Sequence, residues 1–156
     1  VESETSFALG RNARTRTAGQ FTQGGNQFAA NGDAQSSVFV LKAQTTDGSA
    51  VAMTSMGASL FINNDTTWAF KCLIVARNVN SNAESAAYEV TGCIDRESGG
   101  TTALVGTPTV TVIAEDVPAW NVTVSAGASN LVISCTGELN KTIRWVGRLE
   151  LAEVTC

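Results

Sequence analysis

The sequence predicts an all-β fold, an antiparallel β-sandwich of the jelly-roll type preceded by an extended arm. Three observations support this fold class. First, β-branched residues dominate, with 16 Val against 9 Leu and 19 Thr against 3 Lys, and these residues suit a pleated sheet better than a helix. Second, from residue 36 short apolar runs alternate with turn residues about every ten residues. Third, no segment longer than a turn shows helical apolar periodicity.

Residues 1–35 differ in composition from the rest of the chain. They are rich in Gly and Ala, include three of the seven arginines, and lack Val, Ile and Leu apart from Val1 and Leu9. Such a segment cannot bury a core of its own, so we expect an extended arm that docks on a neighbouring surface, or a flexible linker. Arg11, Arg14 and Arg16 suit carboxylates on another chain, and a solvated charged run is the alternative interpretation.

Residues 36–156 form the predicted sandwich domain. We expect strands at 37–46, 50–54, 58–63, 67–78, 85–95, 101–105, 109–115, 119–125, 130–137 and 142–154. Turn residues such as Asp47-Gly48 separate these runs. In 142–154 both alternating rows are partly apolar, so we expect one face against the core and the other against a partner subunit.

Composition and charge exclude several functional classes. With 156 residues the chain has the size of one domain, and with no His it lacks the commonest general base and metal ligand. A net charge of −4 argues against a nucleic-acid partner. The longest apolar run, at 72–76, is far shorter than the roughly 20 residues of a membrane span, and residues 1–4 do not resemble a signal peptide. We expect no cofactor, no metal and no membrane insertion.

Four cysteines are spaced too widely for a metal or thioredoxin-like motif. Alternation places Cys72 and Cys135 in apolar rows, so we expect both to be buried. Cys156 ends the sequence and is the best candidate for an exposed thiol, whereas the position of Cys93 is ambiguous. We therefore predict a disulfide from Cys156 to another chain or to Cys93.

Residues that could carry chemistry fall mainly in predicted loops. Asp95, Glu97, Glu115 and Asp116 could supply a carboxylate pair for glycoside hydrolysis, although adjacent carboxylates in turns are usually solvated. We therefore expect no catalytic residues. Among the aromatic residues, Trp68 and Trp145 are expected in the core, and Trp120, at a strand start after Pro118, is the predicted exposed stacking platform.

Several stretches together suggest a family. They are GRNARTRTAGQF (10–21), GDAQSS (32–37), TWAF (67–70), VAR (75–77), IDR (94–96), GTTALVG (100–106) and KTIRWV (141–146). With these stretches the chain resembles C-terminal head domains of bacteriophage fibre and tail proteins. The resemblance implies a virion protein made in the host cytoplasm, a homotrimer with a compact β-sandwich per chain, and no catalytic signature. Other fibre or tail proteins of the virion are its implied partners.

The function expected from these observations is non-enzymatic attachment of a phage to a host-surface glycan or protein. The contacts are expected from loops at 63–66, 78–84, 95–100 and 116–120. The candidate receptor-binding residues in them are Asn64, Asp65, Asn80, Asn82, Asp95, Glu97, Asp116 and Trp120. One alternative is a purely structural collar, neck or capsid fibre or decoration protein. Another is a tailspike-like glycan depolymerase, although such enzymes commonly use long parallel β-helices and this chain is short.

Overall fold

The computed structural model describes residues 5–80 and 83–156. Its strands are β1 (Phe7–Arg11), β2 (Phe21–Gly25), β3 (Ala34–Thr45), β4 (Ala50–Ala52), β5 (Leu60–Phe61), β6 (Thr66–Asn78), β7 (Ser85–Arg96), β8 (Thr102–Leu104), β9 (Thr109–Glu115), β10 (Asn121–Ala126), β11 (Asn130–Thr136) and β12 (Ile143–Thr155). Within the described ranges no helix has the length and apolar character needed to cross a membrane.

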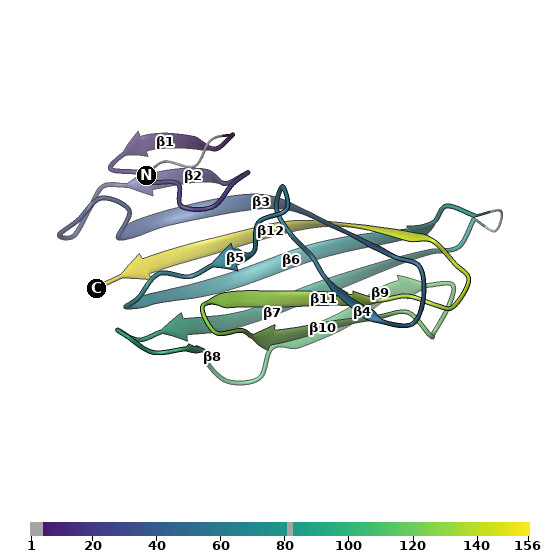
Figure 1. Cartoon of the computed structure of the whole chain (residues 1–156). Coiled ribbons are helices and arrows are strands. Elements are labelled where there is room, and N and C mark those ends of the chain that lie inside the picture. Colours follow the sequence, from purple (N-terminus) through teal and green to yellow (C-terminus); the bar gives the residue numbers. More distant parts are fainter. Residues whose placement is uncertain (1–4, 81–82) are drawn as a thin grey trace.

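The strands form two sheets that pack face to face (Figure 1). The large sheet has eight strands in the order β1-β2-β3-β12-β6-β7-β8, and β9 pairs with β7 along the same edge as β8. The small sheet has four strands, with β10, β11 and β4 in order and β5 also paired to β11. Every pairing is antiparallel except that of β1 with β2. The all-β sandwich predicted from the sequence is therefore confirmed.

Strict alternation along the long strands builds the core between the sheets. In β12 and β6 alternate side chains are buried, among them Trp145 and Ile74, while their neighbours face outward. Trp145 lies at the centre of an aromatic cluster, with ring centroids 6.2 Å from Tyr88 and 5.9 Å from Trp120. The prediction that Trp120 is an exposed platform is therefore wrong, because its ring fills the space beside Trp145 and is only 2% exposed.

The ten predicted strands are all present, with ends shifted by a few residues. β1 and β2 were not predicted, because they lie in the Gly- and Ala-rich segment where apolar alternation is absent.

Glycine is required where β1 and β2 meet. Gly10 has a φ of +89°, and a Cβ on it would lie 2.7 Å from the carbonyl oxygen of Gly24. The predicted boundary between residues 35 and 36 falls inside β3, so we use the name arm from here on for residues 5–33. Because β2 pairs with β3, the arm joins the same sheet as the sandwich.

The outer face of the large sheet, opposite the small sheet, carries exposed apolar side chains. We call Val40, Leu73, Val75 and Val146 the outer patch; each is 47% to 65% exposed. The strand register places Val146 beside Val75, and places Arg148 between Val40 and Leu73. The second apolar row predicted for 142–154 is therefore real, and in the single chain it faces outward.

Candidate ligand-binding site

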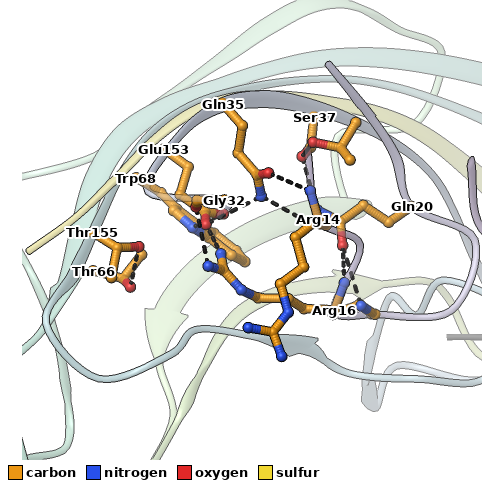
Figure 2. Close-up of polar contacts among 12 residues, drawn as sticks. Arg14, Arg16, Gln20, Gly32, Gln35, Ser37, Thr66, Trp68, Glu153 and Thr155 are labelled. Atoms are coloured by element: carbon orange, nitrogen blue, oxygen red, sulfur yellow. Dashed lines mark hydrogen bonds and ion pairs between the residues drawn. The ribbon is translucent and has the colours of Figure 1, made fainter. Parts of the chain in front are cut away.

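The arm crosses one end of the sandwich, where side chains on the inner face of the large sheet hold it. Gln35 on β3 bonds both backbone groups of one residue, because Arg14 N donates to its Oε1 and its Nε2 donates to Arg14 O, each at 3.0 Å. Gln20 accepts from Arg16 N at 2.6 Å and donates to Ser37 Oγ at 2.8 Å (Figure 2). These bonds fix the backbone of residues 14–20 on the sheet.

A buried carboxylate anchors this network. The Glu153 side chain on β12 is 1% exposed and forms an ion pair with Arg16, whose side chain is 14% exposed. Glu153 also accepts hydrogen bonds from Trp68 Nε1 at 2.9 Å and from Gln35 Nε2 at 3.3 Å. Arg16 Nη2 donates to Gly32 O at 3.0 Å. The arm thus supplies the only charge that neutralises Glu153 among the described residues.

A pocket opens beside this network, between the arm and the loop after β5. We call it the arm-end pocket; its lining residues are Arg14, Arg16, Phe61 and Asn63, and its volume is about 400 Å³. The Arg14 guanidinium points away from the network (Figure 2) and forms no ion pair or hydrogen bond with any described residue. Phe61 is 40% exposed. The pocket therefore combines an unpaired cation with an accessible aromatic ring.

Three guanidinium groups, those of Arg14, Arg16 and Arg96, lie around this pocket. The Arg96 guanidinium lies 5.4 Å from the centre of the Phe61 ring. Arg96 is held there because its Nη1 donates to Ile62 O at 2.9 Å and its Nε donates to Gly100 O at 3.1 Å. Burial, and after it the neighbouring charge of Arg14, lower the pKa of the Arg16 guanidinium. Like charges are thus held close together, and Glu153 pairs with only one of them.

The predicted receptor-binding residues separate into two groups at opposite ends of the sandwich. Asn64, Asp65, Asp95 and Glu97 lie at the end that carries the arm-end pocket, because β6 begins and β7 ends there. Asn80, Asp116 and Trp120 lie towards the far end, and Asn82 is outside the described residues. One contiguous site from all four predicted loops is therefore excluded.

At the far end, two of the candidate side chains hold the fold together. Asn80 Oδ1 accepts from Thr142 N at 2.8 Å, and Asp116 Oδ2 accepts from Ser85 N at 2.8 Å. Each bond joins segments distant in the sequence. These side chains therefore have structural partners already, in contrast to Arg14.

The four acidic residues considered for glycoside hydrolysis do not come together, because Asp95 and Glu97 lie at one end of β7 and Glu115 and Asp116 at the other. Glu115 accepts a hydrogen bond from the Tyr88 hydroxyl at 3.0 Å, and burial followed by this bond raises the pKa of Tyr88. Asp95 lies in the β7 register opposite Thr67, at the other end of the strand. Within the described ranges no group of three or more acidic or Cys side chains is arranged to hold a metal ion.

The structure places the cysteines largely as predicted. Cys72 and Cys135 are fully buried and Cys156 is exposed, as expected, while Cys93 is half-buried; all four thiols are free in the single chain. A bridge between Cys93 and Cys156 is not compatible with the strand register. The register separates them by two strand spacings and four residues, roughly 16 Å, whereas a disulfide needs Cα atoms about 4.4 to 6.8 Å apart. The bridge to another chain stays a prediction.

Sequence reasoning found only part of the arm-end pocket. The arginines of the arm were predicted as partners for carboxylates, and the predicted contact loop 63–66 includes Asn63, although Asn64 and Asp65 were the candidates named in it; Phe61 was missed. Phe61 follows buried Leu60 at the end of a two-residue strand. A large aromatic residue on the outward row beside an Asn-rich turn is the signal that could have identified the pocket wall.

Comparison with known proteins gives a low-level structural similarity. No family model and no curated protein matches the sequence. Among solved structures, 76% of the chain aligns with 18% of the tailspike protein gp49 of Acinetobacter baumannii bacteriophage Fri1, a capsular polysaccharide depolymerase, at 14% identity and a TM-score of 0.42. The same share aligns with 22% of the tailspike protein of Acinetobacter phage vB_ApiP_P1, at 13% identity and a TM-score of 0.43. The chain spans less than a quarter of either protein, and similarity this low does not assign a function.

Proposed function

We propose that this chain is a non-enzymatic attachment module of a bacteriophage fibre or tail protein, and that it contacts the host surface at the arm-end pocket. The observation that carries the proposal is the unpaired Arg14 guanidinium beside the open ring of Phe61. The fold does not need this arrangement, because the arm is already fixed through Gln35, Gln20 and Glu153. A cation and an aromatic ring presented together suit a ligand with polar and apolar surfaces.

Binding to host cells tests this function. Fluorescently labelled chain is expected to bind host bacteria or their lipopolysaccharide and to compete with phage adsorption. Arg14→Gln should weaken binding by at least about tenfold, the effect of losing a hydrogen bond to a charged group. Arg77→Gln, a change at an exposed arginine on the outer face, is the matched control and should bind as the wild type does. Lack of binding by folded wild-type chain would contradict the proposal.

A purely structural role in the virion is the second candidate, and the outer patch favours it. Four exposed apolar side chains on neighbouring strands are typical of a surface that another subunit covers. The homotrimer proposed from the sequence would use this face. A chain that is trimeric by light scattering but binds no host surface would support this second role over attachment.

A depolymerase is the enzymatic alternative. It requires two carboxyl groups about 5 to 9 Å apart across a sugar-binding cleft. Glu115 instead accepts a bond from Tyr88, and Asp116 accepts one from the backbone of Ser85. We expect no release of reducing sugar from host polysaccharide, and measurable release would overturn the non-enzymatic assignment.

A further inference from the structure

We propose that the arm-end pocket binds a sugar that carries a carboxylate, an acidic residue of a saccharide, through the Arg14 guanidinium. This inference rests on the proposed attachment function and names the chemistry of its ligand. It follows from how Arg14 is held, from the charge around it and from the other groups that line the pocket.

The backbone of Arg14 is fixed while its side chain stays available. Both its peptide N and its carbonyl O bond to the Gln35 side chain, and Gln35 in turn is held by Glu153. The guanidinium leaves this fixed point and reaches the pocket without a partner among the described residues. A ligand that binds there orders only the end of one side chain, which reduces the entropic cost of binding.

Of the three arginines around the pocket, Arg14 alone has no partner among the described residues. Arg16 is paired with Glu153, and Arg96 bonds only to backbone carbonyl oxygens. Asp33, the carboxylate whose charge acts on Arg16, accepts hydrogen bonds from the backbone N–H groups of residues 28–30, and no described carboxylate forms an ion pair with Arg14. Arg14 therefore has no direct counter-ion among the described residues, and a carboxylate on a ligand would supply one.

The shape and chemistry of the lining favour a carboxylate attached to a sugar ring. The planar guanidinium fork matches the two oxygens of a carboxylate in a bidentate contact. Arg96 lies over the Phe61 ring, 5.4 Å from its centre, and the part of Phe61 that stays exposed, 40%, can contact the apolar face of a sugar. Asn63 offers both a donor and an acceptor for hydroxyl groups. A free phosphate would use the cation but not the ring or the amide.

The test is an amide NMR titration of the full chain with sodium glucuronate, glucose, sodium acetate and inorganic phosphate at equal ionic strength. Glucuronate is expected to shift signals of residues 14, 61 and 63 at millimolar concentration, whereas glucose and acetate shift them at least about tenfold more weakly. Arg14→Gln should abolish the glucuronate shifts, and Arg77→Gln should leave them unchanged. Because Gln35 binds only the backbone of Arg14, the Arg14→Gln chain should melt at the wild-type temperature.

Each other outcome overturns a stated part of the inference. If glucose binds as well as glucuronate, the carboxylate is not recognised, although attachment to a neutral glycan survives. If acetate or phosphate binds as well, the sugar ring has no role and the ligand is a simple anion or a peptide carboxylate. If none of them shifts these signals at tens of millimolar, the inference fails, and the cell-binding assay decides separately whether attachment fails with it.

Discussion

The buried ion pair between Arg16 and Glu153 allows a direct test of how the arm is held. In Glu153→Gln the side chain keeps its volume and one acceptor oxygen, but Arg16 loses its counter-ion. Removing one partner of a buried pair typically costs about 3 to 5 kcal/mol. Arg16 remains 14% exposed and keeps its bond to Gly32 O, so we expect the lower end, about 3 kcal/mol in the free energy of unfolding. That is a large share of the roughly 5 to 15 kcal/mol that stabilise a typical domain.

Urea unfolding followed by tryptophan fluorescence measures this loss. Glu150→Gln is the matched control, because Glu150 also pairs with an arginine, Arg148, but on the exposed outer face. A surface pair contributes about 1 kcal/mol or less, so the control should change stability little. In the double variant Arg16→Gln/Glu153→Gln the two losses should not add, since no buried charge remains unpaired.

Trypsin cleavage provides a second readout of the same change. With Glu153→Gln the arm should detach more often, so cleavage at Arg11, Arg14 and Arg16 should become faster while the sandwich stays intact. If Glu153→Gln costs less than about 1 kcal/mol, or no more than Glu150→Gln, the ion pair does not hold the arm and the reasoning is refuted.

Three further predictions concern acid stability, association and thiols. Hydrogen bonds from backbone N–H groups of residues 28–30, foremost residue 30, lower the pKa of Asp33. The ionised Asp33 carboxylate therefore stabilises the fold above its ordinary pKa of about 3.9, and this stabilisation is lost as the pH falls below that value. Asp33→Asn should flatten the loss of stability on acidification, and an unchanged pH profile would contradict this. Leu73→Asp in the outer patch should turn a wild-type trimer into a monomer by light scattering, and a wild type that is monomeric at micromolar concentration would refute the trimer. Burial raises the pKa of Cys72 to about 12 and also raises that of Cys135. A thiol reagent at neutral pH should therefore label Cys156 first and label Cys72 and Cys135 only in denaturant. A dimer band on non-reducing electrophoresis that Cys156→Ser abolishes would support the bridge between chains.

Local pattern was enough to predict most of the fold. In 142–154 the alternation of Ile143, Trp145 and Leu149 with a row that includes Arg144, Arg148 and Glu150 predicts the buried and exposed rows of β12. The corresponding alternation in their own strands identified Cys72 and Cys135 as core residues. A strand with one face on the core buries every second side chain, and this alternation of apolar and polar residues can be recognised in the sequence.

Features that depend on tertiary packing could not be predicted in this way. Trp120 follows a proline turn and looked exposed, but its burial depends on Trp145, which lies 25 positions later in the chain. The arm-end pocket joins residues 14–16 of the arm with residues 61–63, and the carboxylate that fixes the arm comes from position 153. Such pairings follow from sheet order, which a single sequence does not reveal.

Competition with phage adsorption most directly tests the central claim that this chain attaches to the host through the arm-end pocket. The measurement is the concentration of added chain that halves adsorption, compared between Arg14→Gln and Arg77→Gln. We predict that Arg77→Gln competes like the wild type and that Arg14→Gln requires at least about ten times more protein. Equal competition by the two variants, with both folded, would contradict the account.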